Sequence, residues 1–205
     1  MWLIFLTPIS IITFLFYYAS TGGFGDMPDL EVLENPKTNL ASEIFTSDGK
    51  TLAKYYFNDN RTPVTFDELP THLVDALIAT EDIRFYSHSG IDFKRTFGAA
   101  LKFGKDGGGS TITQQLAKLL FTGEGSKDII ERLTQKFKEY IIAVRLERNY
   151  TKDEIITQYL NLYDFGNNGD GIRSAARIYF GKEPIDLDIN ESAILVGMLK
   201  NSSYY

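Results

Sequence analysis

One glutamate, Glu81, occupies the position in this sequence that most strongly suggests acid–base chemistry. It follows Leu73 and Leu77 at intervals of four residues, so a helix beginning near Pro70 would carry all three on one face. The carboxylate would then lie on an apolar stripe, at the helix end that carries partial negative charge. Both surroundings disfavour the charged form, as a general acid or base working near neutrality requires. The simpler alternative is an exposed acid that pairs with Arg84.

A glycine run at residues 107–109 forms a second region of interest. Thr111 and Gln114 have the spacing of a capping box, so a helix should begin directly after the glycines, a geometry that attracts anions. A Walker A loop is excluded, because Ser110 stands where its lysine must be. The polar face of this helix would be either solvated or able to grip a sugar and its phosphate, and it comprises Thr111, Gln114, Gln115 and Lys118. The core face comprises Ile112, Leu116, Leu119 and Leu120.

A third candidate, Glu139, lies in the longest expected helix, residues 128–149. Its stripe comprises Arg132, Lys136, Glu139 and Ala143. The core-facing set comprises Ile130, Leu133, Phe137, Tyr140 or Ile141, and Val144. A glutamate among basic neighbours is usually a surface ion pair. In a cleft opposite Glu81 it would instead be a second active-site acid.

The elements that must position these residues are nearly all helical from Phe66 onward. Capping boxes at 151–154 and 188–191 begin two further helices, the second running to about residue 200. Gly181 closes a helix at 171–180. Between residues 41 and 57, an Asp-Gly turn separates two alternating apolar runs, which predicts a β-hairpin. Residues 91–108 mix aromatic residues with lysines and suit either a membrane interface or an ordinary surface helix.

The composition limits the classes of function. The 205 residues carry a net charge of −6, which gives no reason to expect nucleic-acid binding. The absence of cysteine excludes disulfides and thiolate metal sites, and two histidines cannot build a histidine-rich one. A divalent cation would therefore depend on carboxylates and on oxygens of the substrate.

An uncharged apolar run at residues 2–19 is just long enough to cross a bilayer with a hydrocarbon core of about 30 Å. A cleaved signal peptide and a buried core helix are the alternatives, but no basic segment precedes the run and no clear cleavage site follows it. We expect a membrane anchor at 1–20, a linker with the hairpin at 21–65 and a catalytic domain at 66–205. The chain also looks like a fragment of a longer protein.

Five blocks in this order resemble the peptidoglycan glycosyltransferase domain of class A penicillin-binding proteins, glycosyltransferase family 51. The first two are E-D-x-x-F-x-x-H-x-G at 81–90 and G-G-S-T-I-T-Q-Q-x-x-K at 108–118. The third resembles R-K-x-x-E at 135–139, and the last two lie at 152–161 and 171–182. Three residues depart from the family pattern: Gln135 replaces the arginine of the third block, Leu119 an asparagine, and Thr157 a glutamate. Arg132, one turn earlier, is a candidate substitute for the missing arginine.

The resemblance implies a mainly α, lysozyme-like fold whose small lobe, about residues 91–108, dips into the membrane. The implied substrate is lipid II. Glu81 would be the general base that deprotonates the acceptor 4-hydroxyl, which attacks the donor's anomeric carbon with inversion. Lys118, with Arg132 or Lys136, would neutralise the leaving polyprenyl pyrophosphate.

The resemblance also assigns the remaining residues. Glu139 would be catalytic and would orient the pyrophosphate, with Mg²⁺ or Mn²⁺ as a candidate bridging ion and no organic cofactor. The sugar and phosphate subsites would involve Ser110, Thr111, Gln114 and Gln115, and the supporting residues would be Asp82, Arg84, Phe85 and His88. The implied protein is a single-pass protein of the cytoplasmic membrane with its catalytic domain on the outer face. A C-terminal transpeptidase domain and cell-wall assembly proteins would be its partners.

Two rival functions remain open. A lysozyme-like or lytic transglycosylase would use Glu81 as an acid on glycan polymer. A membrane-anchored cell-wall scaffold would have kept the fold and lost the activity, as the replacements at Gln135 and Thr157 could indicate.

Overall fold

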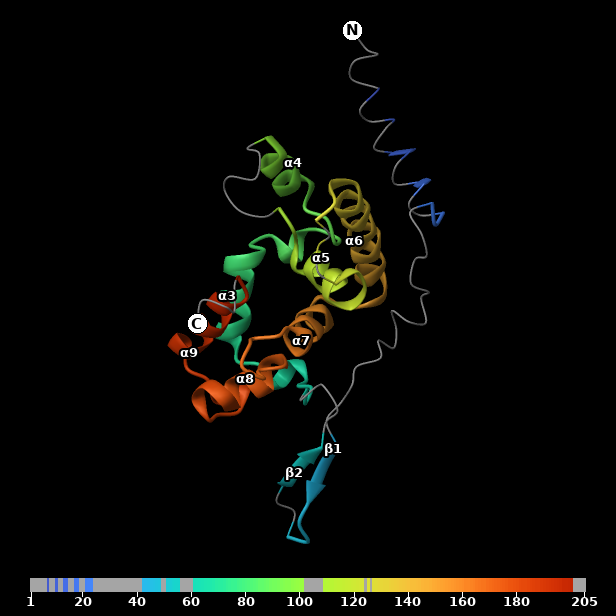
Figure 1. Cartoon of the computed structure of the whole chain (residues 1–205). Coiled ribbons are helices and arrows are strands. Elements are labelled where there is room, and N and C mark those ends of the chain that lie inside the picture. The colour runs from blue at the N-terminus through green and yellow to red at the C-terminus, as the bar shows by residue number, and fades with distance from the viewer. Residues whose placement is uncertain are drawn as a thin grey trace. The chain divides into compact units, whose positions relative to one another are not determined.

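The computed structural model describes residues 42–48, 51–55, 61–101, 109–123, 125 and 127–200, with isolated positions between residues 7 and 23 (Figure 1). The predicted anchor at 1–20 and linker at 21–39 lie largely outside the described residues, as do residues 102–108 of the segment predicted to touch the membrane. Within the described part of the chain, no helix is both long enough and apolar enough to cross a bilayer.

The described chain is mainly helical, as the sequence predicts. Its α-helices are α3 (Thr71–Glu81), α4 (Phe93–Leu101), α5 (Ile112–Ala117), α6 (Ile129–Asn149), α7 (Lys152–Leu162), α8 (Gly171–Phe180) and α9 (Ile189–Met198) (Figure 1). Three 3₁₀ turns are η1 (Phe66–Glu68), η2 (Phe85–Ser87) and η4 (Pro184–Asp186). One π-helical turn, η3 (Lys118–Thr122), follows α5 directly.

Two short strands of the described chain precede α3. β1 (Ser42–Phe45) and β2 (Thr51–Tyr55) pair antiparallel, with Ser42 opposite Tyr55 and Phe45 opposite Thr51 (Figure 1). The register shifts between Ile44 and Phe45. Both strands fall inside the 41–57 segment for which the sequence predicts a hairpin.

The contacts divide the chain into two compact units. The α5–α6 unit comprises Met1–Pro36 and His88–Tyr150, and the α3–α9 unit comprises Lys37–Ser87 and Thr151–Tyr205. The candidate site residues are therefore distributed over both units, and the chain passes from one unit to the other immediately before His88 and immediately after Tyr150.

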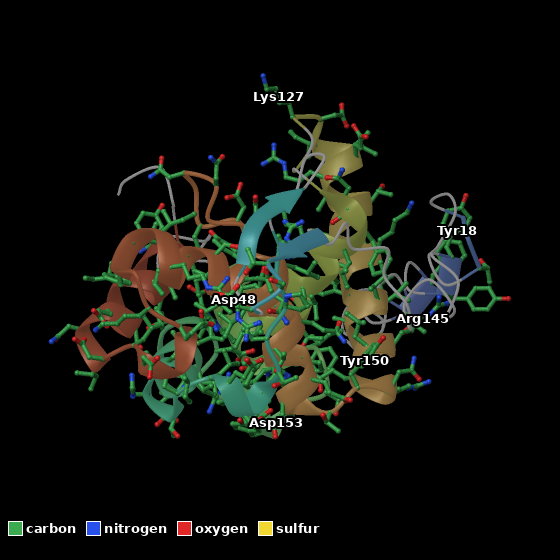
Figure 2. The ribbon with its side chains drawn as sticks, turned by 90° about the horizontal axis from the view of Figure 1, so that it is seen from below. Tyr18, Asp48, Lys127, Arg145, Tyr150 and Asp153 are labelled. Carbon is green, nitrogen blue, oxygen red and sulfur yellow. The ribbon has the colours of Figure 1, made fainter. Side chains whose placement is uncertain are left out.

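In the α5–α6 unit, α5 and η3 pack against α6, whose ends are marked by Lys127 and Tyr150 in Figure 2. The core of the unit includes Ile112, Leu116, Ala117, Ile142, Ala143 and Leu146. The predicted core-facing stripe of α6 is wrong in its first turns, where Ile130 and Leu133 are 77% and 57% exposed. The packed face runs instead through Glu139, Ala143 and Leu146. Periodicity finds apolar faces, but it cannot show which face has a neighbour.

In the α3–α9 unit, α3 packs on α9 and α7 on α8. The two predicted capping boxes are present, at Thr151 with Glu154 and at Asp188 with Glu191. They begin α7 and α9 where the sequence predicts. Gly181 ends α8 with φ of 67°, in the left-handed region that glycine adopts at low cost.

Candidate active site

Glu81 is the last residue of α3, as the four-residue spacing predicts. Leu73, Val74 and Leu77 of the same helix are buried, and Glu81 is half-buried at the end of their stripe. The sequence pattern therefore places this carboxylate correctly, on the packed side of the helix and at its C-terminal end.

Two tyrosines, one in α7 and one directly after it, interact electrostatically with Glu81. Tyr159 is fully buried, and its ring centroid lies 5.8 Å from that of Tyr163. Burial raises the pKa of both phenols, and the negative charge of Glu81 raises the pKa of each further. The hydroxyl of Tyr163 donates to the carbonyl of Leu199 at 2.7 Å, at the end of α9. Glu81 therefore lies within electrostatic range of two fixed aromatic side chains.

The residues that follow Glu81 support the helix end. Asp82 is 1% exposed and caps α3, its N–H donating to the carbonyl of Ile78 at 3.0 Å. Phe85 is fully buried, and the Lys152 ammonium lies 4.2 Å from its ring centroid in a cation–π contact. Arg84 is half-buried, and its carbonyl accepts from the Ser87 hydroxyl at 2.8 Å. Asp82 and Phe85 are therefore buried directly after the helix end, and their supporting role stays a prediction.

The start of α5 forms the predicted capping box. The Thr111 hydroxyl accepts from the Gln114 N–H at 3.1 Å, and the Gln114 side-chain oxygen accepts from the Thr111 N–H at 3.4 Å. Thr111 and Gln114 also donate to the carbonyl of Gly90, at 2.7 and 3.0 Å. Gly90 has φ of +87°, and a Cβ there would lie 2.8 Å from the backbone of Ala143.

These contacts correct one part of the sequence analysis. Thr111 and Gln114 do not share an open polar face with Gln115 and Lys118, because both are fully buried. Gln115 is half-buried and Lys118 is exposed. Leu119, predicted to face the core, is 40% exposed because the π turn η3 rotates the chain after α5. The buried pair therefore ties the first motif block to the second through Gly90.

Four side chains form what we call the Lys136 cluster: Ser110, Thr122, Lys136 and Glu139. The Lys136 ammonium donates to the Ser110 hydroxyl at 2.7 Å and to Glu139 Oε2 at 2.6 Å. The Thr122 hydroxyl donates to Glu139 Oε1 at 3.3 Å. The Lys136 side chain is 36% exposed, whereas that of Glu139 is 8% exposed. The cluster therefore holds the Lys136 ammonium, which is partly open to solvent, in a fixed position on the nearly buried Glu139 carboxylate.

The other two basic candidates are placed differently. Lys118 is exposed at the end of α5. Arg132 is also exposed, and its guanidinium reaches the carbonyl of Lys127 at 3.5 Å. Of the three, the structure brings Lys136 together with Glu139 and Ser110. Lys136 is therefore the stronger candidate for the charge that the arginine missing at Gln135 would supply.

Sequence comparison identifies the family. A family model described as transglycosylase matches residues 48–205. This chain belongs to the transglycosylase family. Among its relatives are penicillin-binding protein 1A of Escherichia coli K12 (39% identical over 87% of this chain and 21% of that protein) and penicillin-binding protein 1F of Bacillus subtilis 168 (43% over 82% and 23%). Penicillin-binding protein 1A of Vibrio cholerae is 37% identical over 98% of this chain and 23% of that protein.

The resemblance to glycosyltransferase family 51 is therefore confirmed. This transglycosylase chain spans about a fifth to a quarter of the length of the curated relatives it matches. The predicted site residues of the α3–α9 unit are Glu81, Asp82, Arg84 and Phe85. Those of the α5–α6 unit are His88, Ser110, Thr111, Gln114, Gln115, Lys118, Arg132, Lys136 and Glu139. Thr122 is not predicted from the sequence, because its contact with Glu139 depends on a π turn that no motif predicts.

The described residues of this transglycosylase do not form a metal site by themselves. Within the part of the chain that the structure describes, no three His, Asp or Glu side chains are grouped so as to hold an ion. Both oxygens of Glu139 already accept hydrogen bonds, and the Lys136 ammonium at 2.6 Å would repel a cation. A divalent ion would need to displace Lys136 and take most of its ligands from a bound phosphate.

Proposed function

We propose that this domain is a peptidoglycan glycosyltransferase that polymerises lipid II into glycan strands with release of polyprenyl pyrophosphate. Family membership supports glycosyl transfer in cell-wall synthesis. The observation that carries the finer proposal is the Lys136 cluster. A partly exposed ammonium is held between the Ser110 hydroxyl and the Glu139 carboxylate, beside the N-terminus of α5.

The chemistry of the leaving group explains why such a cluster favours synthesis. When the anomeric C–O bond of a lipid-linked donor breaks, negative charge develops on the pyrophosphate, and a preorganised cation stabilises that charge. When glycan polymer is hydrolysed, the leaving group is a sugar hydroxyl, and a carboxylic acid protonates it. A fixed lysine therefore suits transfer from a pyrophosphate better than it suits hydrolysis.

Glu81 is proposed to be the general base. Its carboxylate would take the proton of the acceptor 4-hydroxyl while that oxygen attacks the anomeric carbon of the donor from the face opposite the pyrophosphate. One C–O bond forms and one breaks, the configuration inverts, and the electron pair leaves with the pyrophosphate. The half-buried position of Glu81 at the end of α3, within electrostatic range of Tyr159 and Tyr163, supports this role, because a general base must be held in a fixed position against the hydroxyl that it deprotonates.

The remaining residues have graded roles in the proposal. Lys118 and Arg132 are exposed and would add positive charge for the pyrophosphate, and Gln115 would contact sugar or phosphate. Thr111 and Gln114 would act indirectly, by fixing Gly90 and the start of α5.

The loop after Glu81 would be supported by Asp82, Arg84, Phe85 and His88. Mg²⁺ or Mn²⁺ would enter with the pyrophosphate and take its ligands from the phosphate oxygens, because Thr122 and Lys136 already occupy both oxygens of Glu139, and no step above depends on the ion.

The cellular context is proposed at the same level. The apolar run at 2–19 would anchor the chain in the cytoplasmic membrane, with the domain at 66–205 on the outer face and a lysozyme-like fold whose small lobe touches lipid. In its full form the protein would continue into a transpeptidase domain and act with other cell-wall assembly proteins.

Incubation with two substrates tests the proposal. The chain in detergent micelles receives labelled lipid II in one reaction and polymeric glycan in the other. We expect polymer and polyprenyl pyrophosphate from lipid II and no change in the glycan. Shortening of the glycan without polymer formation would instead identify a lytic enzyme, and no reaction with either substrate would favour an inactive scaffold.

A further inference from the structure

We propose that Thr122 is a positioning residue whose hydroxyl holds the Glu139 carboxylate, so that Lys136 stays directed at the diphosphate of the substrate. This inference rests on the proposed function, because it concerns the same cationic site. It assigns a role to a residue that lies outside the motif blocks and carries no chemistry of its own.

The hydrogen bonds of the Lys136 cluster form a continuous chain. Thr122 binds one oxygen of Glu139 and Lys136 binds the other, at 3.3 and 2.6 Å. A carboxylate held at a single oxygen can rotate about its last torsion, which has broad minima. Held at both oxygens, it fixes the position of the ammonium that it binds. Lys136 then has a set direction toward Ser110, 2.7 Å away.

The π turn η3 places Thr122 within reach of Glu139. The N–H of Gly123 donates to the carbonyl of Lys118, five residues earlier, at 2.9 Å. Such a turn contains one more residue than an α-helical turn, so Thr122 is displaced around the axis from the position an α-helix would give it. Single π turns are rare and occur frequently at functional sites. The turn therefore points to a role beyond packing.

The exposures of the two charged groups separate their roles. Glu139 is 8% exposed at its side chain and is poorly placed to contact a ligand, whereas Lys136 at 36% remains open. A carboxylate buried to this degree is costly unless its partners are fixed. Glu139 therefore acts as the anchor of Lys136, and Thr122 completes the anchor.

Three variants of the full chain in detergent micelles test the role of the hydroxyl. Thr122→Val removes the hydroxyl and keeps the shape, and Thr122→Ser keeps the hydroxyl. Thr134→Val is the matched control, because the Thr134 hydroxyl donates to the carbonyl of Ile130 in its own helix α6, at 2.9 Å. The measurement is calorimetric binding of inorganic pyrophosphate, accompanied by thermal unfolding of each variant.

We expect Thr122→Val to weaken pyrophosphate binding about tenfold, roughly the value of one hydrogen bond to a charged group. Thr122→Ser and Thr134→Val should stay within about twofold of the unchanged chain. With lipid II, Thr122→Val should raise KM by more than it lowers kcat, as expected for a defect in binding.

Three results would overturn the inference: unchanged pyrophosphate affinity in Thr122→Val, an equal loss in Thr122→Ser, or no pyrophosphate binding by the unchanged chain. Failure of the proposed function looks different. A chain that binds pyrophosphate in a Thr122-dependent manner but makes no polymer from lipid II would refute the glycosyltransferase proposal and leave the role of Thr122 standing.

Discussion

Lys136 and Glu139 form an ion pair at 2.6 Å, and this pair determines how single substitutions should affect activity and stability. Removing the partner of a buried charge leaves that charge without compensation, which costs more than the pair contributes. The Glu139 carboxylate is the more buried member. Loss of Lys136 should therefore affect both the charge at the site and the stability of α6 against α5.

Lys136→Met is expected to lower kcat/KM for lipid II by about 100-fold or more, the effect typical of removing one group that stabilises transition-state charge. Arg132→Met should lower it less than about fivefold, since the Arg132 side chain is exposed and its guanidinium donates to a backbone carbonyl at 3.5 Å. Initial rates of polymer formation measure both variants. Equal losses, or a larger loss for Arg132→Met, would show that Arg132 replaces the missing motif arginine.

The stability effect of Lys136→Met has its own control. The double variant Lys136→Met with Glu139→Gln removes the unpaired charge, so its midpoint of thermal unfolding should recover most of what the single variant loses, while activity stays low. A double variant that unfolds as early as the single one would mean that the ion pair does not determine the local stability.

At the scale of elements, Gly90 joins two motif blocks. Its carbonyl accepts from Thr111 and Gln114, its φ is positive, and the backbone of Ala143 on α6 leaves no room for a side chain. The end of the first motif block therefore packs between the start of α5 and the middle of α6.

Gly90→Ala should destabilise the fold by about 2–4 kcal/mol, because a left-handed backbone and a contact with fixed backbone atoms penalise the same methyl group. Gly98→Ala is the control, since Gly98 lies inside α4 and a Cβ there meets nothing within 4 Å. That variant should gain up to about 1 kcal/mol from helix propensity. Urea unfolding of Gly90→Ala and Gly98→Ala measures the two changes in the free energy of unfolding. Equal changes in both variants would argue against the close packing of Gly90.

The last helix offers a test by pH. The hydrogen bond from Lys182 lowers the pKa of Glu191 below its ordinary 4.5, and the same bond raises the pKa of Lys182 above 10.5. Because its pKa is lowered, the Glu191 carboxylate stabilises the fold above pH 4.5, and this stabilisation is lost as the pH falls. Because its pKa is raised, the Lys182 ammonium stabilises the fold up to pH 10.5, and this stabilisation is lost as the pH rises further. The ion pair therefore stabilises the fold between these limits.

Glu191→Gln keeps an acceptor for the capping box but removes the charge. The variant should unfold slightly earlier than the unchanged chain at pH 7, and the difference should be smaller at pH 3, because the Glu191 carboxylate loses its charge as the pH falls. Thermal unfolding at both pH values measures this. A difference that is the same at pH 3 would trace the effect to the cap and exclude the ion pair.

The elements also show where sequence reasoning succeeds. Capping boxes at Thr111, Thr151 and Asp188 begin helices where expected, because three-residue spacing is a local signal. The exposed Ile130 and the buried Gln114 were not predicted. Both depend on contacts between distant segments: α6 packs through the stripe of Glu139, and Gln114 binds a carbonyl 24 residues away. Thr122 was missed because a π turn has no spacing rule.

At the scale of the whole molecule, the candidate groups belong to two units that each have their own core. Glu81 and its two tyrosines lie in the α3–α9 unit, and the Lys136 cluster lies in the α5–α6 unit. Under the proposed function, both groups serve one reaction, the first by accepting a proton and the second by holding the pyrophosphate. Substitutions in the two units should then affect different steps.

This division gives a prediction that separates binding from proton transfer. Glu81→Gln should leave the affinity for inorganic pyrophosphate within about twofold, since Glu81 takes no part in holding it, whereas Lys136→Met should lower that affinity at least tenfold. Calorimetry on the two variants side by side measures this. A loss of pyrophosphate binding in Glu81→Gln would contradict the separation of roles.

The most direct test of the central claim is the rate at which Glu81→Gln makes polymer from lipid II, compared with a variant of the neighbouring Asp82, Asp82→Asn. If Glu81 is the general base, Glu81→Gln should fold normally and polymerise at least about 1,000-fold more slowly, within the range that general-base catalysis supplies. Asp82→Asn should keep more activity than Glu81→Gln, since Asp82 caps α3 and contributes no base. A folded Glu81→Gln variant that polymerises within a few-fold of the unchanged chain would contradict the mechanism.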